Sequence, residues 1–330
     1  MALDILIHHM GDPDAALALA ERLRPDLRAG ERITARASVV VAGLDPAVPE
    51  PGDVRWPISA GADAPDVVVL LDARSLAPEP GFLQGLRRAP REWDAWTGPL
   101  LTTNGAAVAT AGLGLTLLAA TVPLRRGMPV ARLPQTPFLT DALPPPLIAV
   151  RRRVSDGMHG LLATRDPRAL ALMLALGLRA AGERAGVAPA ARARLRPGAP
   201  APWAPTPSAA RVRAAVAAYP TGVLAAAAPA AALAVSVGLV RSMARGAGRP
   251  ALERVAEAAG ALPAAIRDRP AGAPIRAVGG ATFGDGIVAD GPAGTATGML
   301  AGAWWGAAAG VMRAGRARAR RRAARSTPTA

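Results

Sequence analysis

Residues 66–71 read DVVVLL, in which Asp66 opens an unbroken run of five aliphatic residues that is followed directly by Asp72. A run without alternating polar positions predicts a strand that is buried on both faces of a parallel sheet. Two similar runs precede it, Leu3–Ile7 and Ala37–Ala42, and we expect the three to be neighbouring parallel strands. A helical pattern follows the first run, and another is expected around Gly81–Arg88. This alternation predicts an α/β fold with a mostly parallel sheet flanked by helices.

The composition excludes several kinds of functional site. The chain has no Cys, which rules out disulfide frameworks, Cys-ligated zinc and thiol catalysis. Its three histidines are too few for a multi-histidine metal centre, and adjacent His8 and His9 would point to opposite faces of a strand. Aromatic residues make up only 3% of the chain, so base stacking is not expected and nucleic acid is not an expected partner.

Five segments of the chain occur in the order and spacing of a known family. They resemble family-2 glycosyltransferases of the GT-A fold (nucleotide-diphospho-sugar transferases), and the resemblance covers roughly residues 1–196. The helical region that follows, around Arg241–Arg269, is similar to the helical extensions of the actinobacterial-type enzymes of that family. The first segment corresponds to the strand, acidic motif and helix of that family, and the third to a strand that ends in paired arginines. The segments are VVVLLDARSLAPEPGFLQGL (Val67–Leu86), TGPLLTTNGAAVATAGL (Thr97–Leu113), PLIAVRR (Pro146–Arg152), LALGLRAAG (Leu174–Gly182) and VAPAAR (Val187–Arg192).

The resemblance implies transfer of a sugar, of hexosyl type, from a nucleotide-sugar donor to an acceptor hydroxyl. In the family an Asp-X-Asp motif binds the donor through a divalent cation. Asp72 matches the first acid, and Arg74 stands at the position of the second. A single carboxylate is a poor anchor for Mg²⁺ or Mn²⁺, and Arg74 could contact the diphosphate directly instead. An equally weighted interpretation is a surface pair of Asp72 and Arg74 at a strand end.

The resemblance also implies a nucleoside-binding acid and an acceptor base. Asp45 follows the second predicted strand, where the family often holds the nucleoside-binding acid, although Leu44-Asp45-Pro46 also suits a turn. The Glu-Asp base motif is absent from residues 170–173, LALM. Asp166 and Asp141 are the candidates for the base, although the Asp-Pro step favours Asp166 as the N-cap of a helix that begins at Pro167. With both motifs degenerate, loss of catalysis stays open.

The sequence predicts four regions. They are a GT-A-like domain (1–196), a Pro-rich linker (197–210), a helical extension (211–270) and a Gly/Ala-rich candidate membrane segment with an Arg-rich tail (271–330). The stretch 214–240 is uncharged but mostly Ala, so we expect it to pack as a helix rather than to span a membrane. Arg241–Arg269 is amphipathic, with one apolar face. That face consists of Leu252, Val255, Ala259, Leu262 and Ile266.

The C-terminal region favours a membrane. Gly291–Met312 carries no charge, and a Gly at every fourth position forms one stripe that would let helices approach closely and self-associate. Seven arginines follow between Arg313 and Arg325, and all 39 basic residues of this chain, whose net charge is +15, are Arg. This pattern predicts association with the cytoplasmic face of a membrane. The glycines of the stripe are Gly294, Gly298, Gly302, Gly306 and Gly310.

Two functions therefore follow from the sequence. The first is a membrane-associated glycosyltransferase that acts on an envelope polysaccharide or a lipid-linked acceptor. The second is a non-catalytic relative that keeps the fold and serves as a membrane-associated scaffold or partner subunit.

Overall fold

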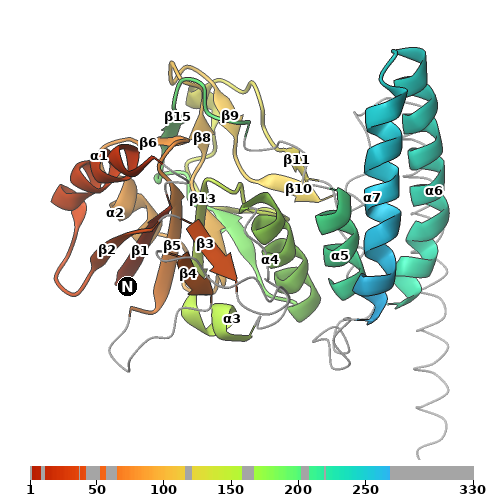
Figure 1. Ribbon diagram of the computed structural model, residues 1–330. Coiled ribbons are helices and arrows are strands. Elements are labelled where there is room, and N and C mark those ends of the chain that lie inside the picture. The colour runs from red at the N-terminus through yellow and green to blue at the C-terminus, as the bar shows by residue number, and fades with distance from the viewer. Residues whose placement is uncertain are drawn as a thin grey trace, which may run out of the picture. The chain divides into compact units, whose positions relative to one another are not determined.

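The computed structural model describes nine ranges of the chain (Figure 1). Contacts divide the chain into two compact units, one of residues 1–114 and 121–207 and the other of residues 115–120 and 208–330. The division at residue 208 falls inside the stretch that the sequence assigns to the linker. The described residues are 2–8, 12–36, 38–41, 53–56, 65–115, 121–157, 167–201, 208–218 and 221–267.

The first unit is built on a seven-stranded sheet in the order β12-β14-β7-β13-β5-β1-β2. β1 is parallel to β2 and β5, and β14 is parallel to β7, whereas β13 is antiparallel to both of its neighbours and β12 to β14. Five of the seven strands therefore run in one direction, and the predicted α/β class is confirmed. The strands are β1 (Leu3–His8), β2 (Arg32–Arg36), β5 (Val67–Asp72), β7 (Ala95–Thr97), β12 (Phe138–Leu139), β13 (Leu147–Arg151) and β14 (Ala185–Val187).

The two central strands, β1 and β5, are buried along their whole length. Alternate side chains of a strand point to opposite faces, so a continuous apolar run fills both layers of a sandwich. The face that carries Ile5 and Val69 packs against helices α1 (Pro13–Leu23) and α2 (Phe82–Arg87). Helix α4 (Pro167–Ala181) is also largely buried, and it lies on the side of the sheet away from α1 (Figure 1). Helices thus flank the sheet, as predicted.

One predicted strand does not join the central sheet. The run Ala37–Ala42 contains β3 (Ser38–Val41), which pairs in parallel with β4 (Asp53–Trp56) in a separate two-stranded sheet. The neighbour of β1 is β2 instead. β2 lies at the sheet edge, and it has the sequence RITAR, in which Arg32 is exposed and Ile33 is half-buried. An edge strand needs no continuous apolar run, so the apolar criterion selects the wrong segment.

Short elements complete the first unit. A four-stranded sheet has the order β6-β15-β8-β9, and β10 pairs with β11. These elements are β6 (Leu76–Pro78), β8 (Leu100–Leu101), β9 (Val108–Thr110), β10 (Leu113–Leu115), β11 (Thr121–Pro123), β15 (Ala193–Leu195), α3 (Arg152–Gly157) and the 3₁₀ helices η1 (Arg24–Asp26) and η2 (Val130–Arg132).

The second unit consists, in its described part, of α5 (Ser208–Ala218), α6 (Thr221–Ala244) and α7 (Gly248–Arg267). Both α5 and α6 pack against α7. Within the described ranges, none of the helices combines the length and the apolar character that crossing a membrane requires. The glycine stripe of residues 294–310 and the arginine tail lie outside the described residues.

Candidate functional site

Two polar residues lie side by side at the carboxyl ends of the parallel strands β1 and β5. His8 ends β1 and Asp72 ends β5, and the two residues are direct partners in the parallel register. Both are buried, with exposed fractions of 5% and 6%. In open α/β sheets, ligands bind outside the carboxyl ends of the parallel strands. This edge is therefore the candidate functional site.

The chain leaves β5 through a tight turn in which Asp72 bonds to its own loop. Its Oδ1 accepts a hydrogen bond from the Arg74 backbone N–H at 3.0 Å, and its Oδ2 accepts one from the Ser75 hydroxyl. The Ala73 N–H donates to the His8 carbonyl at 3.0 Å, which ties the turn to β1. An Asp that caps the turn after it in this way fixes the local backbone.

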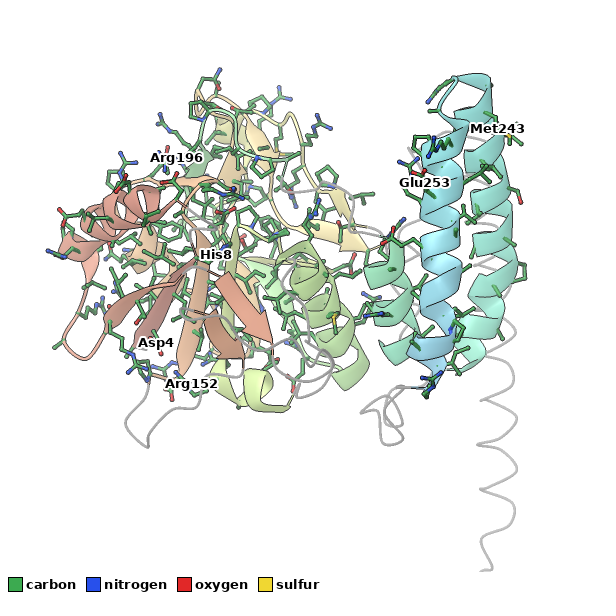
Figure 2. The ribbon with its side chains drawn as sticks, viewed as in Figure 1. Asp4, His8, Arg152, Arg196, Met243 and Glu253 are labelled. Carbon is green, nitrogen blue, oxygen red and sulfur yellow. The ribbon has the colours of Figure 1, made fainter. Side chains whose placement is uncertain are left out.

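Arg196 closes the same turn from the other side. Its backbone N–H donates to the Ser75 carbonyl at 2.9 Å, and its Nη1 donates to the Ala73 carbonyl at 3.0 Å. Figure 2 labels His8 and Arg196. Arg74 itself is exposed, whereas Ser75 is fully buried. The turn of residues 72–75 is thus a rigid support from which Arg74 alone is exposed.

The described residues do not fit a divalent cation at this edge. Both oxygens of Asp72 accept hydrogen bonds within the turn, and Arg74 occupies the position of the second acid of the motif. Among the described residues, no group of three or more His, Cys, Asp or Glu side chains could hold a metal ion. A hard cation takes several oxygen ligands, which Asp72 cannot provide alone.

The other predicted site residues divide into two groups. Asp141 lies after β12, and its Oδ1 accepts a hydrogen bond from Arg179 Nη1 of α4 at 2.8 Å. This ion pair joins the loop to the helix and engages one oxygen of a candidate base. Asp45 and Asp166 lie outside the described residues, and both stay predictions.

The paired arginines lie at the opposite edge of the sheet from Asp72. β13 is antiparallel to β5, and Arg151 pairs with Val67 at the start of that strand. Five residue steps along β5 separate this point from Asp72, roughly 17 Å. These arginines are therefore too far away to share a diphosphate with Asp72.

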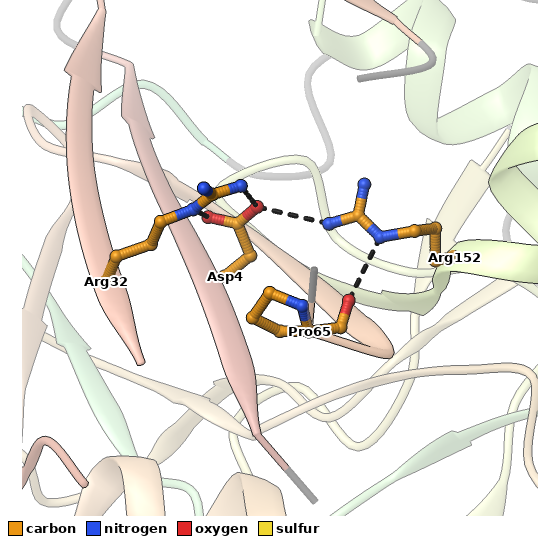
Figure 3. Close-up of polar contacts among 4 residues, drawn as sticks. All are labelled: Asp4, Arg32, Pro65 and Arg152. Carbon is orange, nitrogen blue, oxygen red and sulfur yellow. Dashed lines mark hydrogen bonds and ion pairs between the residues drawn. The ribbon is translucent and has the colours of Figure 1, made fainter. Parts of the chain in front are cut away.

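Instead, these arginines hold the amino-terminal edge of the sheet together. Asp4 is buried, and its carboxylate receives two hydrogen bonds from Arg32, at 2.9 and 2.8 Å, and one from Arg152 at 3.1 Å (Figure 3). Arg152 Nε also donates to the Pro65 carbonyl at 3.0 Å. Arg151 donates to the Trp93 carbonyl at 2.7 Å, and its guanidinium lies 5.7 Å from the centroid of the Trp96 ring.

A second carboxylate cluster lies at the amino-terminal ends of β7 and β14. Asp94 is buried and accepts hydrogen bonds from Arg153 and from the Arg184 backbone N–H, the latter at 3.0 Å. Hydrogen bonding to Asp94, followed by desolvation, raises the pKa of Glu183 to about 7. Burial works against ionisation of Asp94, yet its bonds with Glu183, Arg184 and Arg153 lower the pKa of Asp94 overall. The two carboxyl groups therefore share a proton near neutral pH.

Sequence reasoning missed the partners of Asp72 and both clusters at the opposite edge. Ser75 follows Asp72 by three residues, a spacing typical of a capped turn, so its contact with Asp72 had a local signal. Arg196 is 123 residues from Ala73 in the chain, and Arg152 is 148 residues from Asp4. Contacts at such separations have no local signal in a single sequence.

Comparisons with known proteins give a likeness of fold. No family model matches the sequence, and it has no match among curated proteins. Among solved structures, the chain is similar to the crystal structure of GalNAc-T7 with UDP, GalNAc and Mn2+, with a TM-score of 0.44 and 10% sequence identity over 66% of this chain. The chain spans about half of the length of that protein, 48%. The GT-A-like, family-2 and actinobacterial assignments stay predictions from the sequence motifs.

Proposed function

We propose that this protein binds a nucleotide-sugar donor at the edge formed by His8 and Asp72 and transfers the sugar to an acceptor hydroxyl. The observation that carries the proposal is the pairing of these two buried polar residues at the carboxyl ends of adjacent parallel strands. In open α/β sheets this edge, outside the carboxyl ends of the parallel strands, is where ligands bind. The proposed acceptor is an envelope polysaccharide or a lipid-linked glycan.

Arg74 is the proposed partner of the donor diphosphate. It is exposed on a turn whose backbone is held by Asp72, Ser75 and Arg196, so the position of its Cα is fixed before a ligand arrives. A guanidinium stays charged at all physiological pH values and can bond two phosphate oxygens at once. It would offset the charge that develops on the leaving diphosphate without a metal ion.

The acceptor base is the least supported part of this proposal. Of the two sequence candidates, Asp141 is engaged by Arg179, so Asp166 is the better one. The same observations favour the second candidate function, a non-catalytic relative that acts as a scaffold or partner subunit. Such a protein would need neither a free base nor a metal ligand set, and Asp72 would serve only to cap its turn.

The proposed location is the cytoplasmic face of a membrane. The support for it is the sequence of residues 291–325, an uncharged Gly-rich stretch followed by seven arginines. Self-association through the glycines of that stretch is part of the same proposal.

The donor site is tested by a thermal-shift panel of nucleotides and nucleotide-sugars in EDTA and in Mn²⁺. We expect one nucleotide class to stabilise the protein in EDTA, and Arg74→Ala to weaken that binding by about 10-fold or more, the loss of one charge-assisted contact of roughly 1.5–3 kcal/mol. The matched control is Arg88→Ala, which removes another exposed arginine, at the end of α2. Binding that requires Mn²⁺ and ignores Arg74→Ala would overturn the assignment. No stabilisation by any nucleotide would favour the scaffold.

A further inference from the structure

Exposed apolar side chains of the described residues gather on two helices. Eight large apolar residues are exposed in the described part of the chain, and six of them belong to α6 and α7. A single exposed apolar side chain is ordinary, whereas a concentration on one helical pair indicates a contact surface. The six are Val235, Val240, Met243, Leu252, Leu262 and Ile266.

Helix α7 packs through a different face from the one that its sequence favours. The residues that α7 buries are small: Ala251, Ala261 and Ala265. Of the predicted apolar face, Leu252 is 48% exposed and Ile266 is 60% exposed. The hydrophobic effect alone would place the larger side chains inside. The helical unit therefore leaves its more apolar surface for another contact.

Three of the six exposed apolar residues of α6 and α7 lie where α6 turns into α7. We call this region the hairpin tip; it comprises the apolar Val240, Met243 and Leu252 and the exposed arginines Arg245, Arg249 and Arg254. Figure 2 labels Met243 at this end of the helical pair.

The hairpin tip is a well-formed turn. The Gly246 N–H donates to the Met243 carbonyl at 3.0 Å, and the Ala247 N–H donates to the Ser242 carbonyl at 2.8 Å. Gly246 has a φ of +72°, which glycine adopts without strain at the end of a helix. The side chains of the tip are thus presented by a fixed backbone.

The positive charge of the tip indicates which kind of partner its apolar side chains would contact. Residues 208–267 contain seven Arg and two Glu, which gives a net charge of +5. Within the tip Arg249 bonds to Glu253 at 3.1 Å, and Glu257 follows Arg254 by three residues. The arginines of the tip outnumber these carboxylates, and a purely apolar partner would leave the excess positive charge uncompensated. An anionic lipid surface matches both components, because apolar side chains enter the acyl boundary while arginines stay among the phosphates.

We propose that the hairpin tip binds an anionic membrane surface, with Val240, Met243 and Leu252 in the interface and Arg245, Arg249 and Arg254 on lipid phosphates. This proposal deepens the membrane location proposed above, but it rests on described residues of α6 and α7 and not on the C-terminal stretch. It places a membrane contact on the helical unit itself, which would hold the protein at the surface where a lipid-linked acceptor lies.

The test is flotation of the full-length protein with vesicles of phosphatidylcholine, with and without phosphatidylglycerol. We expect binding only to the anionic vesicles, weakened by salt. Changing Arg245, Arg249 and Arg254 to Gln should weaken it by about fivefold per arginine, on the order of 100-fold in all. Met243→Ser should weaken it by about tenfold. The matched controls are Arg88→Gln and Leu17→Ser, which alter an exposed arginine and an exposed leucine of the first unit.

Three results would overturn the proposal. One is equal binding of wild type and tip variants to anionic vesicles, which would assign membrane binding to the C-terminal stretch; deletion of residues 291–330 would then abolish it. Another is absence of vesicle binding by the wild type. A third is a wild-type dimer that the Met243→Ser change dissociates, which would make the tip a protein interface. Helix content by circular dichroism verifies folding, and the nucleotide panel, read on the same variants, separates this proposal from the donor site.

Discussion

Replacing Asp4 with Asn should destabilise the first unit by about 3–5 kcal/mol. The Asp4 side chain is 1% exposed and receives two hydrogen bonds from Arg32 and one from Arg152. Asn keeps the shape but removes the charge, and its NH₂ group would face guanidinium donors. Arg152 is only 14% exposed, so the change would leave a nearly buried guanidinium without its counter-charge. Removing one partner of a buried ion pair typically costs this amount.

The contribution of each arginine follows from its exposure. Arg32 is 54% exposed, so water screens it, and Arg32→Met should cost only about 1 kcal/mol. Arg152→Met should cost considerably more, because it also removes the bond to the Pro65 carbonyl. In the double variant of Asp4→Asn and Arg152→Met, the loss should be at least 1 kcal/mol smaller than the sum of the single losses.

The assay is urea unfolding read by hydrogen exchange in peptides from β1 and β5. A global probe would mix the unfolding of the two compact units, whereas these strands report on the first alone. The control is Glu92→Gln, which removes an exposed carboxylate and should change stability by less than about 0.5 kcal/mol. A loss below 1 kcal/mol for Asp4→Asn would refute the structural role. So would an Arg152→Met variant of normal stability that no longer binds nucleotide.

Three further predictions follow, two for the first unit and one for α7 of the second. Above pH 7 both Asp94 and Glu183 are ionised. The pKa of Glu183 is about 7 in the folded protein and has its ordinary value of 4.5 in the unfolded chain. The stability that the protonated Glu183 contributes is therefore complete below pH 4.5 and is lost as the pH rises through 7. Glu183→Gln should therefore stabilise the protein at pH 8 by about 1 kcal/mol and leave its stability unchanged at pH 5. The figure at pH 8 is small because Glu183 is exposed and water screens its charge. Thermal melts measure both values, and equal effects at the two pH values would contradict the prediction. Gly98→Ala should destabilise the first unit by about 3 kcal/mol in urea unfolding, because the new Cβ would lie 1.6 Å from the Ala191 carbonyl oxygen. Gly260→Ala should instead stabilise α7 by about 1 kcal/mol, because Gly260 has open space around it.

Much of the fold could be predicted because it depends on local patterns. Most residues of β1 and β5 are apolar, because both faces of the sheet are buried at that point. The edge strand β2 has no such requirement, and its sequence RITAR gave no signal. Gly98 illustrates a motif whose cause appears only in three dimensions. The Gly-Pro step of the resemblance fits a backbone that passes against Ala191, where a side chain has no room.

The candidate site was predictable only at its centre. The position of Asp72 follows from the end of an apolar strand, which local sequence reveals. Its partner His8 depends on strand order, and the support from Arg196 depends on a contact over 123 residues. The paired arginines match the family motif in sequence, but the motif does not tell which edge of the sheet they occupy. The reversal of β13 carries them to the edge opposite Asp72.

A chain whose basic residues are all Arg makes net charge a poor guide to partners. Arg32, Arg151 and Arg152 bond to Asp4 or to backbone carbonyls, so their charges hold the scaffold together rather than select a ligand. An arginine indicates a partner only where its surroundings give a second reason. At the turn after β5 that reason is a rigid backbone beside two buried polar residues, and at the hairpin tip it is the exposed apolar surface beside the arginines. These two places, rather than the overall charge of +15, determine which anions we expect the protein to bind.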